Sequence, residues 1–156
     1  MKPLLKFFIA VTIPLVVGAI AGFFTSSSVN GWFTTLNKPS FNPPNWLFAP
    51  VWTMLYIMMG IAFFLTWKSN AEPLLKKIAI TLFFVQLACN FLWSFIFFYA
   101  QQPGWAFVDI ILLWLMIIFT IFYFGKISAA AAWLLVPYIC WVSFATILNY
   151  SIWKLN

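Results

Sequence analysis

The sequence contains no arginine and no histidine, and its only acidic residues are Glu72 and Asp109. The absence of histidine excludes an imidazole base and a histidine-ligated metal, and the absence of arginine excludes an arginine clamp on phosphate. There is also no pair of carboxylates, no Ser-His-Asp set and no phosphate-binding loop, so conventional acid–base or nucleophilic catalysis has no visible machinery. Eight scattered lysines give a net charge of +6. Without arginine or a basic run, this charge does not indicate binding to nucleic acid.

Charged residues of any kind are scarce, at 6% of the 156 residues, whereas 65% are hydrophobic. Ordinary soluble domains contain about 25% charged residues. The composition therefore predicts an integral membrane protein. Cys89 and Cys140 both lie within apolar runs, and we interpret them as small buried hydrophobic residues rather than as a disulfide.

Five apolar segments are long enough to cross a bilayer as helices, which takes about 20 residues. These runs are too long for the strands of a membrane barrel, and they lack its ten-residue alternation. We therefore expect one all-α membrane domain over residues 1–156, a bundle of five transmembrane helices. The expected spans are residues 5–26, 47–67, 78–100, 104–125 and 127–153. In the first span, Gly18 and Gly22 form a small-xxx-small pair, which favours close approach of a neighbouring helix in the same bundle or, alternatively, of a second chain.

The lysines are distributed unequally between the two sides of such a bundle. The N-terminal side would carry Lys2, Lys6, Lys68, Lys76, Lys77 and Lys126, and the other side Lys38 and Lys154. By the positive-inside rule this distribution predicts a cytoplasmic N-terminus, with the C-terminus and the first loop outside. We expect the membrane to be a bacterial cell membrane. Indoles near span ends favour the headgroup region, so we interpret four tryptophans as anchors: Trp67, Trp105, Trp133 and Trp153.

Three helical faces carry indole, phenol or amide groups at helical spacing. They are Trp52, Tyr56, Met59 and Phe63; Gln86, Asn90, Trp93 and Phe97; and Tyr138, Trp141, Ala145 and Leu148. One such stripe alone is more often helix packing than ligand contact, but three of them favour a cavity. Ala145 is small and lies between large aromatic residues, which leaves room for a flat hydrophobic ligand.

The first loop, expected over residues 27–46, is rich in proline and aromatic residues. Each proline fixes φ near −65° and removes a donor, so the segment cannot simply extend either flanking helix. We predict a rigid lid with an apolar underside, whose lysine would suit a carboxylate on the bound molecule, and porphyrins have this shape and charge. The lid residues are Trp32, Lys38, Pro39, Phe41, Pro43, Pro44, Trp46 and Phe48.

Asp109 stands alone in the fourth span, about six residues past Pro103 and therefore roughly 9 Å along the helix at 1.5 Å per residue. An intramembrane acid is a functional candidate by default. Proton coupling is one interpretation. The other is contact with headgroups, water or a loop donor, because the residue lies close to the interface.

Three blocks of the sequence closely resemble the translocator protein family, also known as the tryptophan-rich sensory proteins or peripheral-type benzodiazepine receptors. The blocks are Trp32-x-x-x-Leu36-x-Lys38-Pro39-x-Phe41-x-Pro43-Pro44-x-Trp46-x-Phe48-x-x-x-Trp52-x-x-Leu55-Tyr56-x-x-Met59-Gly60, Gln86-Leu87-x-x-Asn90-x-x-Trp93-Ser94-x-x-Phe97-Phe98 and Pro137-Tyr138-x-x-Trp141-x-x-x-Ala145-x-x-Leu148-Asn149-Tyr150. The match covers nearly the whole chain.

The resemblance implies a five-helix bundle whose cavity opens under the first loop and binds porphyrins, sterols and synthetic aromatic ligands. It also implies a homodimer and no cofactor beyond porphyrin as ligand. Carried over by position, the pocket contains Trp52, Tyr56, Asn90, Trp93, Phe97, Trp141, Ala145 and Leu148. Phe41 stands where relatives often have tryptophan, which weakens the alternative of a light-dependent porphyrin-degrading enzyme. A proton-coupled transporter using Asp109 is the other alternative.

A further short pattern lies near the C-terminus, where Leu148, Tyr150 and Lys154 fit a proposed cholesterol motif. The pattern is weak by itself, because these residue types are common at helix ends. In a bacterial membrane, where cholesterol is scarce, the match would be incidental.

Overall fold

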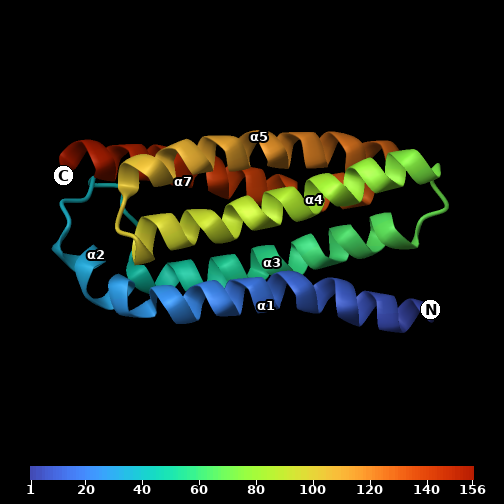
Figure 1. Cartoon of the computed structure of the whole chain (residues 1–156), viewed down its shortest axis with the longest axis horizontal. Helices are drawn as coiled ribbons and strands as arrows, with labels where there is room; N and C mark the ends of the chain where they lie inside the picture. Colours follow the sequence, from blue (N-terminus) through green and yellow to red (C-terminus); the bar gives the residue numbers. More distant parts are fainter.

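The computed structural model describes all 156 residues, and its regular elements are all helices, five of them long and apolar enough to cross a membrane (Figure 1). The fold class predicted from the sequence is therefore confirmed. The elements are α1 (Pro3–Asn30), α2 (Trp32–Thr35), α3 (Asn45–Lys68), α4 (Pro73–Ser94), the π-helix η1 (Phe95–Tyr99), α5 (Pro103–Ile127), α6 (Ala129–Leu134) and α7 (Val136–Leu155).

The helices begin where the sequence supplies suitable starts. Pro3, Pro73 and Pro103 each stand at the first position of a helix. The N–H group that proline lacks would have no hydrogen-bond partner within the helix at this position. Glu72 caps α4, because its carboxylate accepts hydrogen bonds from the backbone N–H groups of Leu74 and Leu75. These two bonds lower the pKa of Glu72, which is fully exposed between two spans.

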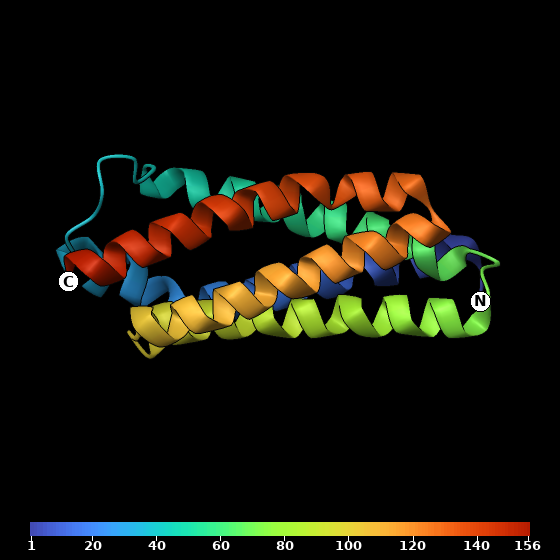
Figure 2. The same ribbon diagram turned by 90° about the horizontal axis from the view of Figure 1, so that it is seen from above.

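The first loop of the structure is shorter than the loop predicted over residues 27–46. Residues 27–30 extend α1, α2 occupies Trp32–Thr35, and α3 already begins at Asn45, so that Pro50 lies inside a helix. Only residues 36–44 are irregular, and we call this segment the lid loop. It arches away from the helix ends at the C-terminal end of the bundle (Figure 2).

The expected fifth span is two helices, α6 and α7, separated at Leu135. Pro137 explains the break, because its nitrogen cannot donate to a carbonyl in the preceding turn. Ser128 starts α6, and its hydroxyl accepts a hydrogen bond from the N–H of Ala131 at 3.3 Å.

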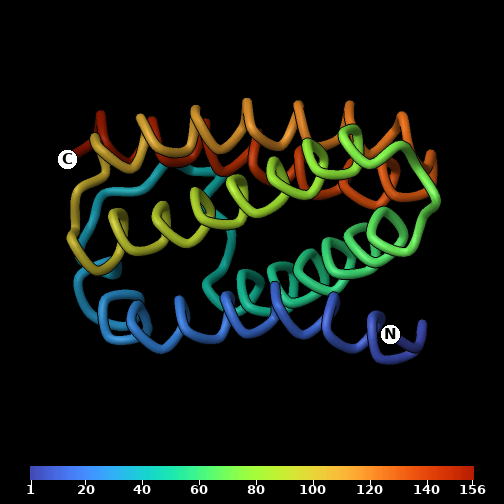
Figure 3. The backbone as a smooth tube through the Cα atoms, turned by 45° about the vertical axis from the view of Figure 1, so that its right-hand side comes forward, coloured from blue at the N-terminus to red at the C-terminus, as the bar shows by residue number.

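The helices form a ring in which α1 packs on α3 and α4, α3 on α6, and α5 on α4, α6 and α7 (Figure 3). The α1–α3 crossing is tight, because a Cβ on Gly60 would lie 2.5 Å from the Cα of Val11. A Cβ on Gly18 would lie 2.4 Å from the Tyr56 ring, whereas one on Gly22 would meet nothing within 4 Å. Gly18 thus serves packing within the bundle.

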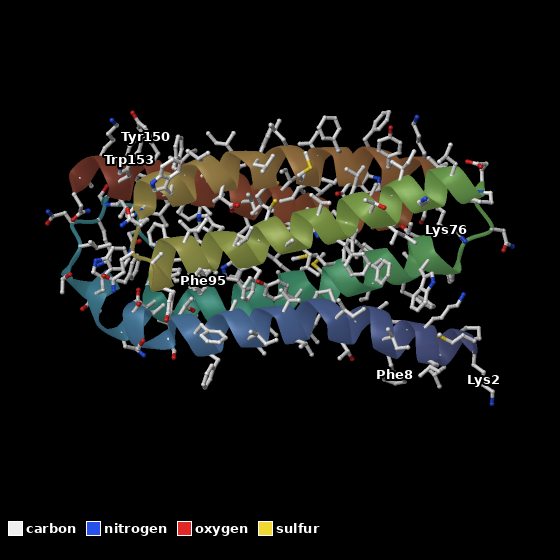
Figure 4. The ribbon with its side chains drawn as sticks, viewed as in Figure 1. Lys2, Phe8, Lys76, Phe95, Tyr150 and Trp153 are labelled. Atoms are coloured by element: carbon white, nitrogen blue, oxygen red, sulfur yellow. The ribbon has the colours of Figure 1, made fainter.

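The two ends of the bundle differ in composition. Lys2 and Lys76 lie at one end, and Tyr150 and Trp153 lie at the other (Figure 4). We call these the lysine end and the lid end.

Candidate functional site: an aromatic cavity at the lid end

A chain of hydrogen bonds crosses the interior and joins α3, α4 and α7. The Tyr56 hydroxyl donates to Oδ1 of Asn90 at 2.9 Å, and Nδ2 of Asn90 donates to the Tyr138 hydroxyl at 2.7 Å. Tyr138 in turn donates to Oε1 of Gln86 at 2.8 Å. All four residues are buried. Because these polar groups satisfy one another, they tie the three helices together and form the floor beneath the cavities at the lid end.

A second set of bonds fixes the Trp93 indole above this floor. Nε1 of Trp93 donates to Oδ1 of Asn149 at 2.9 Å, and Nδ2 of Asn149 donates to the carbonyl oxygen of Pro103 at 2.8 Å. The Nε1 of Trp141 is buried but has no hydrogen-bond partner. Since an unpaired buried donor costs about 1–3 kcal/mol, the Trp141 indole would gain from an acceptor brought by a bound molecule.

The first cavity lies at the lid end, between α2, α3, α4, η1 and α7, and we call it the lid cavity, although no residue of the lid loop itself lines it. Its volume is about 30 Å³, roughly the share of one water molecule and about tenfold below a ligand pocket. Aromatic side chains fill the remaining space. It is lined by Phe33, Phe48, Trp52, Trp93, Phe97, Phe98, Trp141, Phe144, Ala145, Leu148, Asn149 and Ile152.

A larger cavity of about 280 Å³ lies next to it, against α1, and we call it the α1 chamber. Thr25, Ser26 and Asn30 of α1 contribute hydroxyl and carboxamide groups to its lining, opposite Asn45 and Ser94, and no charged residue lines it. The two cavities have five lining residues in common: Phe33, Phe48, Trp52, Trp93 and Phe98.

Trp52 is the centre of this shared wall. Its ring stacks on Tyr56 with a centroid distance of 5.7 Å and lies 6.4 Å from the ring of Trp93. It meets the Tyr138 ring edge-on at 6.3 Å, so the wall stands directly on the hydrogen-bonded floor. Aromatic side chains are the only barrier that the two cavities have in common, and rotation of these side chains would join them.

The predicted pocket residues thus fall into three groups. Trp52, Trp93, Phe97, Trp141, Ala145 and Leu148 line the lid cavity, whereas Asn90 and Tyr138 line neither cavity and belong to the floor. Tyr56 lines the α1 chamber. The contribution of α1 was missed by sequence reasoning, although the small residues Gly18, Ala21 and Gly22 were a signal for it.

The predicted lid residues also take different positions. Trp32 meets Phe97 at 5.9 Å, Phe48 meets Trp141 at 6.0 Å, and Phe41 meets Phe144 at 6.2 Å between ring centroids. The prolines Pro39, Pro43 and Pro44 all lie in the lid loop. Trp46 is 72% exposed and lines neither cavity.

Lys38 brings the one positive charge of the lid loop close to both cavities. Its Nζ lies 4.7 Å from the centroid of the Phe33 ring and donates to the carbonyl oxygen of Leu36 at 3.4 Å. Phe33 lines both cavities. Lys38 itself lines neither cavity, so the Phe33 ring is its link to both of them.

Comparison with known proteins decides the family. A family model described as the TspO/MBR family matches residues 10–154. The chain belongs to the TspO/MBR family. It is 44% identical to the tryptophan-rich protein TspO of Chlorobaculum tepidum over 99% of this chain and 98% of the relative. It is 42% identical to the tryptophan-rich protein TspO of Archaeoglobus fulgidus over 98% of this chain and 98% of the relative. It is 41% identical to the translocator protein of Homo sapiens over 80% of this chain and 75% of the relative.

Within this TspO/MBR chain, the residues of the proposed sterol motif do not share a face. Leu148 is buried in the wall of the lid cavity, whereas Tyr150 is 45% exposed. Nζ of Lys154 lies 4.6 Å from the centroid of the Trp153 ring and 5.8 Å from that of Tyr150. Tyr150, Trp153 and Lys154 form an outward cluster at the lid end.

Asp109 lines neither the lid cavity nor the α1 chamber. It lies in an open groove between η1 and α5, its side chain is half-buried, and its Oδ2 has no hydrogen-bond partner. The structure therefore separates the intramembrane acid from the aromatic site.

Proposed function

We propose that this chain is a membrane receptor or carrier that binds porphyrins and other flat hydrophobic ligands, such as sterols and benzodiazepine-type drugs, in the cavities at the lid end. The observation that carries the proposal is the wall around Trp52. The Trp52 ring stacks on Tyr56 at 5.7 Å and lies tilted against Trp93 at 6.4 Å, and this wall separates one collapsed cavity from one open chamber. A flat aromatic molecule could replace ring–ring contacts with equivalent contacts to itself, each worth about 0.5–1.5 kcal/mol.

The polar groups around the wall favour a ligand that has a flat apolar body and an acceptor at its edge. The buried N–H of Trp141 lacks an acceptor, and Lys38 supplies a charge beside Phe33. A porphyrin dicarboxylate supplies both an acceptor and a negative charge, whereas a sterol supplies only a hydroxyl as acceptor and no charge. We therefore place porphyrins first among the ligands.

The family names agree with binding or transfer of a ligand without naming one. Relatives are called translocator proteins, and the relative in Cereibacter sphaeroides is called a tryptophan-rich sensory protein. For this chain we propose the orientation that the lysines predict, with the lysine end in the cytoplasm and the lid end outside. The homodimer implied by the resemblance stays a prediction, which cross-linking in native membranes would test.

A binding experiment tests the proposal. Purified protein is titrated with protoporphyrin IX and with its dimethyl ester, which keeps the flat ring but removes the two negative charges. We expect saturable binding of both, with the ester weaker, and we expect the difference to shrink in Lys38→Gln. Non-saturable binding of both molecules would overturn the proposal. A light-dependent enzyme would instead turn the porphyrin into a new absorbing product.

A further inference from the structure

Asp109 is an intramembrane carboxylate for which the chain supplies no partner. Its Oδ2 is buried and accepts no hydrogen bond. The lysines at the lid end are both engaged elsewhere, Lys38 over Phe33 and Lys154 over Trp153. Lys126, the only cation on α5, lies 17 residues away, which is about 26 Å along the helix at 1.5 Å per residue.

An unpaired carboxylate charge in this position is expensive unless the group takes up a proton or pairs with a cation from outside the chain. Asp109 lies in a groove of about 510 Å³ that is open to the surroundings of the bundle. The groove runs between Ile96 and Ala100 on one side and Val108 and Leu112 of α5 on the other. In a membrane, the molecules outside the bundle are lipids. The groove therefore leads from the half-buried Asp109 outward to the lipid rather than inward to the cavities.

The groove is polar toward the lid end and apolar toward the membrane centre. Gln102 and Trp105 line it on the lid-end side of Asp109, and Trp105 is 69% exposed. Side chains of a helix tilt toward its N-terminus, and α5 starts at the lid end with Pro103. The carboxylate is thus directed toward the headgroup level, while Leu112 continues the groove toward the hydrocarbon.

We propose that this groove binds a phospholipid with a primary ammonium headgroup, of the phosphatidylethanolamine class. The ammonium donates to the Asp109 carboxylate, the phosphate lies near Gln102 and Trp105, and an acyl chain covers Ile96 and Leu112. A primary ammonium has three N–H donors, as lysine does, and a charge-assisted bond to a carboxylate is about twice as strong as a neutral one. A trimethylammonium headgroup has no such donor. The site therefore discriminates between the two lipid classes.

Native mass spectrometry of the full chain tests this proposal. The protein is exchanged into micelles with equal amounts of dioleoyl-phosphatidylethanolamine and dioleoyl-phosphatidylcholine, and the retained lipid adducts are counted. The wild type should retain the ethanolamine lipid at least about fivefold more than the choline lipid, an estimate from the strength of hydrogen bonds to charged groups. Asp109→Asn should lose this preference, and Asp109→Glu should keep most of it.

Glu72→Gln is the matched control, because it removes the other carboxylate of the chain at the lysine end and should leave the preference unchanged. If Asp109→Asn does not fold, the wild type alone still tests the proposal with mono- and dimethylated ethanolamine lipids, whose retention should fall stepwise. Equal retention of the two lipids by the wild type would overturn the proposal. A preference that persists in folded Asp109→Asn would overturn it as well.

Discussion

Asn156, after the end of α7, pairs with both backbone groups of Asn37 in the lid loop. The N–H of Asn37 donates to Oδ1 of Asn156 at 3.0 Å, and Nδ2 of Asn156 donates to the carbonyl oxygen of Asn37 at 2.9 Å. The same Nδ2 also donates to the carbonyl oxygen of Ile152 at 2.8 Å. Because Ile152 lines the lid cavity, this pair latches the lid loop to the cavity wall.

Replacing Asn156 by alanine should release the latch. We expect bound porphyrin to dissociate about 5–10 times faster, while association changes less, because changes within one interface act mainly on the dissociation rate. Hydrogen exchange at the Asn37 amide should also accelerate, and this readout does not depend on the ligand. Asn70→Ala, in the turn at the lysine end, is the control. If neither exchange nor dissociation changes in Asn156→Ala, the latch has no role.

Replacing Ala145 by threonine should weaken binding of bulky aromatic ligands and leave the fold intact. Ala145 is 7% exposed and lines the lid cavity between Trp141 and Leu148. Added atoms in a packed wall cost about 1–3 kcal/mol, or roughly 5- to 150-fold in affinity. Ala88→Thr, on the exposed face of α4, should bind normally. Equal affinity of the two variants in a titration would remove Ala145 from the site.

Two glycines should respond oppositely to alanine. Gly60→Ala places a Cβ 2.5 Å from the Cα of Val11, which should separate α1 from α3 and destabilise the fold by about 1–3 kcal/mol. Gly22→Ala meets nothing within 4 Å and should keep or raise stability, since alanine favours a helix by about 0.5–1 kcal/mol. Thermal unfolding in detergent measures both. Similar melting temperatures would show that the crossing tolerates a Cβ.

The Glu72 cap predicts a pH dependence of stability. The hydrogen bonds from Leu74 and Leu75 lower the pKa of Glu72 below its ordinary value of 4.5. The stabilisation is therefore fully present above pH 4.5 and is lost as pH falls through the lower folded-state pKa. The melting temperature of the wild type should exceed that of Glu72→Gln at neutral pH, and the difference should shrink in acid. A difference that does not depend on pH would show that the carboxylate charge is irrelevant.

The sequence predicted the five long helices because apolar length and scarce charge leave few other folds for this chain. It did not predict the break at Leu135, although Pro137 was visible, because the apolar pattern runs through it. Helical spacing correctly placed Tyr56, Asn90 and Tyr138 on interior faces. Spacing cannot show which group from another helix faces each of these side chains. In the structure they form hydrogen bonds with one another rather than facing a cavity together.

The contribution of α1 to the site could not be predicted from the sequence for a related reason. Gly18, Ala21 and Gly22 carry no group that marks a ligand contact, and they shape the chamber by leaving space. In the same way, the partnership of Asn37 and Asn156 joins residues 119 positions apart, a distance over which no local pattern acts.

The central claim is that a flat ligand binds at the Trp52 wall, and tryptophan-fluorescence titration with protoporphyrin IX tests it most directly. Trp52→Phe and Trp141→Phe should each show less quenching and bind more weakly by about 0.5–1.5 kcal/mol, the usual worth of a specific aromatic contact. Trp133→Phe, whose indole is 72% exposed at the far end of α6, should bind as the wild type does. Thermal unfolding of all three variants would exclude misfolding. Identical affinities for wild type and all three variants would contradict the account, because they would show that porphyrin adsorbs to the apolar exterior without a site.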